Sequence, residues 1–308
     1  MAKDLEVRHC RVLLAVHEHG GVGAAARALG VAQSTVSETL LSLERLLGAP
    51  VTLRRPGQEA ALAPAAEALL PHARALVAAS EAALAAVAGA GRPPIRLGAV
   101  ESISSYLLPG PLAAFRHRWP EVEVRVAIGL CEDLRKRVGR AELDAALTIE
   151  GPDRVRGLHD VERLASVPLR LVVSPAHPLA HAAALGRRDL GAATFLLADH
   201  EGAFNEVIAA WTASASRPPR RESAGSIDGV KRGVLGGDAI GVLPDYAVAE
   251  ELAVGALIAL DLQDPPPPVA LFLTTPTAPM AGSPLESLVA EVREGLQGDG
   301  KQGSGARD

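Results

Sequence analysis

Residues 22–48 constrain this chain more than any other stretch, because two helical patterns meet there across a very short turn. The first pattern, Ala24 to Leu29, stops at Gly30, a residue suited to the left-handed conformation that ends many helices. The second pattern places four apolar residues on one face: Val36, Leu40, Leu43 and Leu47. Only Val31-Ala32-Gln33 connects the two, so the helices must cross rather than run side by side. The stretch predicts a helix-turn-helix.

The opposite face of the second helix is polar. Its short side chains have the size and the hydrogen-bonding groups to reach base edges in a major groove, and they are Gln33, Ser34, Thr35, Glu38, Thr39 and Ser42. A helical hairpin whose polar face is merely solvated fits these residues equally well.

A longer pattern resembles the N-terminal domain of LysR-type transcriptional regulators. It comprises Leu5, Ala15-Val16, Ala25-Ala26, Leu29, Val31 to Ser34, Val36-Ser37, Leu40, Leu43-Glu44 and Leu47-Gly48. The resemblance is specific over the first 65 residues and continues more loosely to about residue 296. The chain departs from the family pattern at Ala32, Thr52 and Leu62 to Ala66, where the family usually has Ser, an aromatic residue and Leu-Thr-x-x-Gly. These departures bear on the details of DNA contact and not on the fold.

The resemblance implies a sequence-specific DNA-binding regulator that is controlled by a small-molecule effector. Its implied partners are double-stranded promoter DNA, the effector, further copies of the chain in a homodimer or homotetramer, and RNA polymerase if the protein is an activator. The implied fold is an N-terminal all-α winged helix-turn-helix, a linker helix, and a two-lobed α/β effector domain like that of periplasmic binding proteins.

A short hairpin is expected at Pro50 to Leu62, with Pro56-Gly57 at its tip. Beside a helix-turn-helix such a hairpin is a wing, and its Arg54 and Arg55 are candidates for phosphate or minor-groove contacts. The full set of residues that we expect to contact DNA is Gln33, Ser34, Thr35, Ser37, Glu38, Thr39, Arg54 and Arg55.

The charge of the chain does not favour strong binding of a single copy to DNA. The net charge is −5, and acidic and basic side chains nearly balance in the first 64 residues. Because neutralisation of phosphates by Lys and Arg supplies most non-specific affinity, one such domain should bind weakly. Two copies side by side would be needed.

Residues 64–87 carry a heptad-like apolar seam that can supply the second copy. The seam consists of Leu69, Ala73, Leu76, Ser80, Ala83 and Val87. One interpretation is an amphipathic helix that lies on its own domain. The family resemblance implies instead a linker helix that pairs with its equivalent in a second subunit, and we expect this dimer interface.

Beyond the linker Gly89 to Pro94, apolar runs suited to buried strands alternate with helical patterns, which predicts parallel sheet and an α/β fold. We expect a DNA-binding domain at 1–63, a linker helix at 64–89, and an effector domain at 93–296. Its lobe I would span about 93–163 and 268–296, and its lobe II about 164–267. Residues 297–308 are expected to be a disordered tail because they are mostly small, polar or charged.

The effector should lie between the lobes, at the carboxyl ends of the strands. The predicted effector-binding residues are Ser102, Ile103, Ser104, Gly129, Cys131, Thr148, Asp199, His200, Ser226 and Asp228. No Lys or Arg stands at these strand ends, whereas Glu101, Asp199, Glu201 and Asp228 do, so the effector is predicted to be zwitterionic, neutral or amine-bearing. Cys131 has no second cysteine in this region, which excludes an intramolecular disulfide switch there and favours a role as pocket wall.

Several other classes of protein are disfavoured. No motif for a nucleotide, metal or nucleophilic enzyme site is present, so we expect neither catalysis nor a cofactor nor a metal. No apolar run is long enough to span a membrane and no signal peptide is evident, so the expected location is the cytoplasm, without membrane contact. The remaining alternative is a cytoplasmic solute-binding protein without a DNA function.

Overall fold

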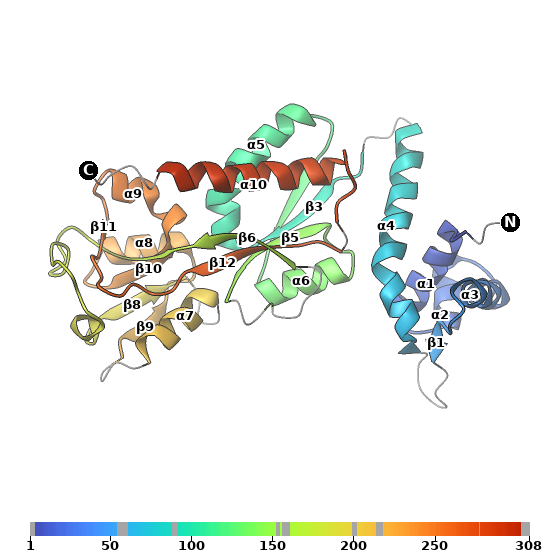
Figure 1. The fold of residues 1–308 in the computed structure, drawn as a ribbon, viewed down its shortest axis with the longest axis horizontal. Coiled ribbons are helices and arrows are strands. Elements are labelled where there is room, and N and C mark those ends of the chain that lie inside the picture. Colours follow the sequence, from blue (N-terminus) through green and yellow to red (C-terminus); the bar gives the residue numbers. More distant parts are fainter. Residues whose placement is uncertain are drawn as a thin grey trace. The chain divides into compact units, whose positions relative to one another are not determined.

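The computed structural model describes residues 4–53, 61–87, 92–151, 155, 161–198, 202–213, 218–276 and 278–302. The chain forms two compact units (Figure 1). The first comprises residues 1–93, and the second comprises nearly all of the rest.

The first unit contains the predicted helix-turn-helix. Its elements are α1 (Val7–His19), α2 (Val22–Leu29), α3 (Gln33–Leu47), β1 (Thr52–Leu53), β2 (Ala61–Leu62) and α4 (Pro64–Val87). Gly30 and Gly48, both at φ +67°, end α2 and α3 in the left-handed conformation, which the sequence analysis predicted for Gly30. Strands β1 and β2 pair antiparallel, as expected for the base of a wing.

One core holds the first unit together. Val36, Leu40 and Leu43 of α3 are buried in it, as predicted, but Leu47 is 37% exposed and lies at its edge. Cys10 on α1 is fully buried as a small apolar residue, and burial raises the pKa of its thiol. The sequence offers Asp4 as a plausible cap near the start of α1, but the helix begins at Val7, where the Glu6 backbone N–H donates to His9 Nδ1 over 3.1 Å.

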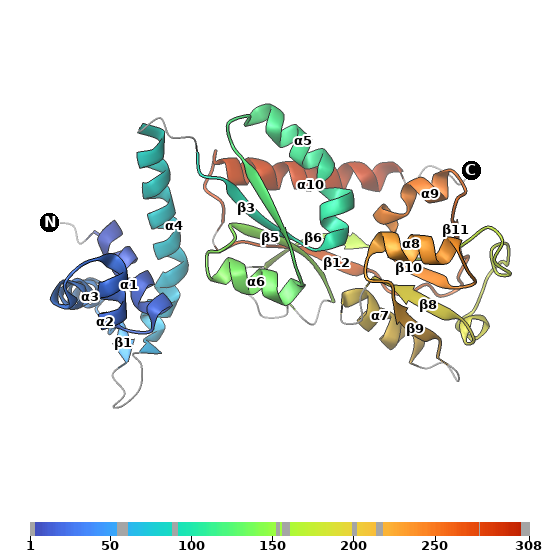
Figure 2. The same ribbon diagram turned by 180° about the vertical axis from the view of Figure 1, so that it is seen from behind.

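Lobe I of the second unit is a five-stranded sheet with helices on both faces. Its order is β4 (Val124–Ile128), β3 (Ile95–Ala99), β5 (Ala145–Glu150), β12 (Val269–Thr274) and β6 (Val161–Val167). Helices α5 (Pro109–Arg118) and α10 (Pro284–Gln302) pack together on one face, and α6 (Cys131–Gly139) covers the other (Figures 1 and 2). Gly98 allows α6 to approach, because a Cβ there would lie within 3 Å of the Leu134 and Leu143 side chains.

Lobe II repeats this arrangement with a second sheet, ordered β11 (Ile258–Ala259), β7 (Leu169–Val173), β10 (Ile240–Pro244), β8 (Thr194–Leu197) and β9 (Arg220–Ser223). Its helices are α7 (Ala203–Thr212), α8 (Ile227–Leu235) and α9 (Ala249–Ala253), with 3-10 turns η3 (Arg187–Leu190) and η4 (Asp245–Ala247). In lobe I, a π-helical segment η1 (Ile103–Leu107) follows β3.

The two-lobed α/β fold agrees with the sequence prediction, and three details differ. Both sheets are mixed rather than parallel, because β12 and β7 return antiparallel to their neighbours. Strand β6 belongs to lobe I, so the chain enters lobe II after Val167, shortly beyond the predicted boundary at about residue 163. Helix α10 is capped by Ser283, whose Oγ accepts from the Glu286 N–H, and it continues to Gln302, although a disordered tail was predicted from residue 297. A helix that is already anchored extends into polar residues at little cost; residues 303–308 lie outside the described part.

Candidate functional site

The first turns of α3 present a polar surface to solvent. Gln33, Ser34, Thr35 and Glu38 are exposed, as a recognition surface requires. Ala32 precedes the helix and has no side chain that can accept a hydrogen bond, so α3 begins without a side-chain cap.

Three other polar residues of α3 are less accessible for contact with DNA. The Thr39 hydroxyl donates to the Thr35 carbonyl over 2.8 Å, and Ser37 is half-buried. Ser42 Oγ lies 3.2 Å from Nε2 of the buried His9. The prediction that Ser42 belongs to the exposed face was therefore wrong, because at this position the helix has turned toward α1.

The wing is only partly described. The N–H of Val51 donates to Glu44 Oε1 over 2.9 Å, which ties the start of β1 to α3. The candidates Arg54 and Arg55 lie outside the described residues.

Helix α4 uses part of the predicted dimer seam inside its own domain. Ala66, Leu70 and Ala73 are buried against the core of the first unit, and Leu69 is half-buried against it. The prediction that Ala73 lies in a subunit seam was wrong, because intramolecular packing already covers it. The exposed part of the seam comprises Leu76, which is 36% exposed, and Ala83, while Ser80 is half-buried. The Val87 side chain is outside the described part.

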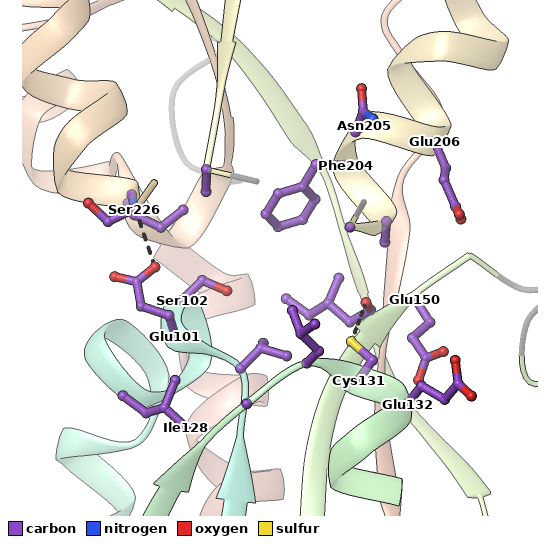
Figure 3. Close-up of a pocket in the computed structure, with 18 of the residues that line it drawn as sticks. Glu101, Ser102, Ile128, Cys131, Glu132, Glu150, Phe204, Asn205, Glu206 and Ser226 are labelled. Carbon is purple, nitrogen blue, oxygen red and sulfur yellow. Dashed lines mark hydrogen bonds between the residues drawn. The ribbon is translucent and has the colours of Figure 1, made fainter. Parts of the chain in front are cut away.

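A cavity of about 660 Å³ lies between the two lobes of the second unit (Figure 3). Lobe I contributes the residues that follow β3 and β4 and the end of β5, and lobe II contributes the starts of α7 and α8. This is the strand-end position that the sequence predicts for a ligand.

Four predicted effector residues line this cavity, namely Ser102, Gly129, Cys131 and Ser226. Ile103, Ser104, Thr148 and Asp228 are not among the lining residues, and Asp199 and His200 lie outside the described part of the chain. Ser226 also caps α8, since its Oγ accepts from the Gly229 N–H over 3.0 Å.

Local structure explains why these four predicted residues do not line the cavity. Strand β5 continues to Glu150, so Thr148 is fully buried within the strand and Ile149 and Glu150 reach the cavity instead. Helical winding after Ser102 turns Ile103 into the core and Ser104 away from the cavity. Asp228 is an exposed partner of Arg232, with 2.6 Å between Oδ2 and Nε.

Sequence reasoning missed one whole wall of the cavity, formed by Ala203, Phe204, Asn205 and Glu206 at the start of α7. Figure 3 shows Phe204 pointing into the space between the lobes. The helical pattern in the sequence begins at Glu206, whereas Gly202 is the residue that precedes the helix. A reading of Gly202 as a helix boundary would have located this wall.

Two hydrogen bonds connect the lobes at the cavity. The Ile227 N–H, at the start of α8, donates to Glu101 Oε2 over 3.4 Å (Figure 3). The Tyr246 hydroxyl donates to Ser102 Oγ over 2.9 Å. Burial raises the pKa of Tyr246 well above its ordinary value, so the phenol keeps the proton that it donates. With one acceptor position of Ser102 occupied, its own hydroxyl hydrogen remains available to a ligand.

A third contact between the lobes involves Lys231 of α8. Its Nζ lies 4.6 Å from the ring centre of Tyr106 and 2.6 Å from Glu251 Oε1. Burial lowers the pKa of Lys231, but hydrogen bonds to Glu251 and Tyr106 outweigh this effect and raise it. The ammonium group therefore remains charged and holds η1 of lobe I against α8.

The cavity wall is acidic. The charged residues that line it in the described part of the chain are all carboxylates: Glu101, Glu132, Glu150 and Glu206. Arg135, behind the wall, pairs with Glu150, and Lys136 pairs with Glu132 over 2.6 Å. The Cys131 thiol donates to the Ile149 carbonyl over 3.3 Å.

Comparison with known families agrees with both units. A model of the bacterial regulatory helix-turn-helix protein of the lysR family matches residues 7–67, and a model of the LysR substrate binding domain matches residues 88–297. The chain belongs to the LysR family of transcriptional regulators. Its N-terminal domain is a DNA-binding domain, and its C-terminal domain is an effector-binding domain.

Individual relatives of this LysR-family regulator support the assignment. A probable hydrogen peroxide-inducible genes activator of Mycobacterium xenopi is 39% identical over 55% of this chain and 89% of its own length. The transcriptional regulator CbbR of Xanthobacter flavus is 30% identical over 86% of this chain and 80% of its own. Solved structures share the fold. The full-length regulator LysG of Corynebacterium glutamicum, solved with bound effector Arg, has a TM-score of 0.69 at 18% identity over 96% of this chain and 99% of the solved chain. ArgP of Mycobacterium tuberculosis has a TM-score of 0.67 at 18% identity over 96% of this chain and 98% of its own.

The family is one of regulators and not of enzymes, and its helix-turn-helix disfavours the alternative of a solute-binding protein without a DNA function. Within the described residues, no helix is both long and apolar enough to cross a membrane.

Proposed function

We propose that this regulator reads promoter DNA with α3 and the wing. Gln33, Ser34, Thr35, Ser37, Glu38 and Thr39 would face the bases or their phosphates, and Arg54 and Arg55 would hold the backbone. The exposure of Gln33, Ser34, Thr35 and Glu38 on the first turns of α3 supports this part of the proposal.

The same proposal places a small-molecule effector in the cavity between the lobes. The observation that carries it is the cavity itself, about 660 Å³ in volume, which combines an apolar wall with polar groups from both lobes. Glu101 and Ser102 line the cavity and also bond to lobe II, so a ligand that contacts them changes the contacts between the lobes.

The regulator would act in the cytoplasm as a dimer or tetramer and would contact RNA polymerase if it activates transcription. The exposed Leu76 and Ala83 of α4 support pairing through that helix. The peroxide response in the name of the Mycobacterium relatives is not proposed for this chain, because Cys131 is the single cysteine of the second unit.

The experiment that tests effector control is a mobility shift with DNA from immediately upstream of the protein's own gene. A small-molecule extract of the source cells is expected to change the affinity or mobility of the wild-type complex. The variant Ala203→Trp places a bulky ring in the wall of the cavity and should bind the same DNA with a much weaker response to the extract. An equal response of both proteins would place the effector elsewhere.

A further inference from the structure

The outer side of α3 carries one apolar residue among polar and charged ones. Ser34, Glu38, Leu41 and Arg45 recur at spacings of four, three and four, so they form one stripe along the helix. All four are exposed, and the stripe lies opposite the buried face of α3. The stripe therefore points away from the core of the first unit.

Leu41 is the unusual member of this stripe. Its side chain is 54% exposed and is not part of the apolar cluster that holds the first unit together. A single exposed leucine is common on protein surfaces, but this one continues the surface of the DNA-binding helix that begins at Ser34. It lies about 10 Å along the helix axis from Ser34, which is the length of about three base pairs. Leu41 is therefore within the stretch of α3 that a major groove can accommodate.

The two neighbours of Leu41 on the stripe carry opposite charges. The Glu38 carboxylate repels phosphate, whereas the exposed guanidinium of Arg45 suits it. Arg45 Nε donates to the Leu41 carbonyl over 3.2 Å, so the arginine side chain folds back along the helix beside Leu41. Leu41 thus lies between a position suited to base edges and a position suited to the DNA backbone. The 5-methyl group of thymine protrudes at that part of the major groove.

We infer that Leu41 contacts the 5-methyl group of a thymine in each half-site. The other groups by which the major groove distinguishes base pairs are hydrogen-bond donors and acceptors, which a leucine cannot pair. Burial of the leucine against the methyl group removes apolar surface from water, and this favours thymine at the contacted position. The inference rests on the proposed function, in which α3 reads promoter DNA.

The test measures binding of the full-length protein to the DNA upstream of its own gene by fluorescence anisotropy. In a set of duplexes, one thymine at a time is replaced by uracil, which lacks the 5-methyl group and keeps the same hydrogen-bonding groups. Burial of one methyl group corresponds to a roughly 4-fold change in affinity. Uracil should therefore weaken binding roughly 4-fold at one thymine position in each half-site. A wild-type protein that tolerates uracil at every position would overturn the inference.

The variant Leu41→Ala should bind the upstream DNA more weakly and should bind thymine and uracil duplexes equally at that position. Leu41 is exposed and alanine favours helix, so the variant should fold, which circular dichroism checks. The uracil series on the wild type decides independently of the variant. A folded Leu41→Ala protein that keeps the full difference between thymine and uracil contradicts the inference.

The matched control is Arg45→Gln, on the same stripe of α3. It should weaken binding to all duplexes and reduce the salt dependence, because it removes a phosphate contact, but it should keep the difference between thymine and uracil. Smaller assemblies of Leu41→Ala in sedimentation, together with equal binding of thymine and uracil by the wild type, would place Leu41 in a contact between protein copies and overturn the inference.

A shuffled duplex is measured in the same series. If the wild type prefers the upstream DNA over the shuffled duplex but is insensitive to uracil, only the role of Leu41 is refuted. If the wild type shows no preference for the upstream DNA, the proposed function itself is refuted.

Discussion

The hydroxyl of Ser102 combines two tasks in the cavity, because it lines the space and accepts from Tyr246 of the other lobe. Ser102→Ala should weaken effector binding by roughly 1–3 kcal/mol, the cost of leaving a buried polar group without its partner. DNA affinity without effector should stay nearly unchanged. Ser104→Ala, in the same segment but away from the cavity lining, is the control. Equal losses for both variants, measured by calorimetry with a bound probe, would contradict this role of Ser102.

Tyr246 should make the free energy of unfolding of the effector domain fall at alkaline pH. Its pKa is raised in the folded state, mainly by burial, so the folded protein keeps a proton that the unfolded chain releases above about pH 10. This contribution to the free energy of unfolding is complete below that pH and is lost as the pH rises toward the folded pKa. Tyr246→Phe should therefore show a smaller loss of stability than wild type between about pH 10 and 12 in chemical denaturation. If the stability of wild type and variant fell by the same amount over this pH range, the loss would come from another group and the prediction for Tyr246 would be wrong.

Glu38 is electrostatically unfavourable near DNA, because α3 carries no Lys or Arg between Gln33 and Glu44 that would offset its negative charge. A carboxylate near phosphates is tolerable if it accepts a hydrogen bond from a cytosine N4 amino group or if it stays in solvent. If it reads a base, Glu38→Gln should lose about 1–3 kcal/mol of discrimination at one base pair per half-site.

If Glu38 stays in solvent, the same variant should bind all sequences more tightly without a change in preference. Binding to a library of half-site variants at one salt concentration separates the two outcomes. Glu67→Gln on α4 makes the same change of net charge at an exposed position of the same domain and is the control.

At the scale of elements, α4 divides its surface between its own domain and a partner. Leu70 and Ala73 face α1, and Leu76 remains exposed. If α4 pairs with its equivalent in a second subunit, Leu76→Glu would bury a charge, at a cost of several kcal/mol unless the helices separate. Sedimentation of this variant should show smaller assemblies than the wild type.

The control for that variant is Ala78→Glu, because residue 78 is exposed and about 200° around the helix from Leu76. It should sediment like the wild type. A wild-type assembly in both variants would refute an interface through α4.

The elements themselves were largely predictable, because strong apolar periodicity and glycine stops mark α2, α3 and the buried strands. The direction in which neighbouring strands pair was not predictable. The antiparallel return of β12 depends on where the chain re-enters lobe I, which local sequence does not encode. The short exposed strand β9 has no buried face and therefore no apolar signal. The errors in the cavity wall arose where an element boundary lay one to three residues from its predicted place, as at Glu150 and Ala203.

At the scale of the whole molecule, a DNA-binding unit and an effector unit are joined in one chain. The family and the separate elements were recognisable from the first 65 residues, since the helix-turn-helix has a fixed spacing of apolar and polar positions. The charge of the cavity wall was only partly recognisable, because Glu132, Glu150 and Glu206 converge through the packing of three elements that are distant in the sequence.

The most direct test of the account is the preference of the full-length protein for its own upstream DNA. Fluorescence anisotropy at one fixed salt concentration compares that DNA with a shuffled duplex of the same length and composition. A specific regulator should prefer the upstream DNA by roughly 10³-fold or more, the lower end of the usual ratio. Equal affinity for the two duplexes would contradict the claim that α3 and the wing read a promoter sequence.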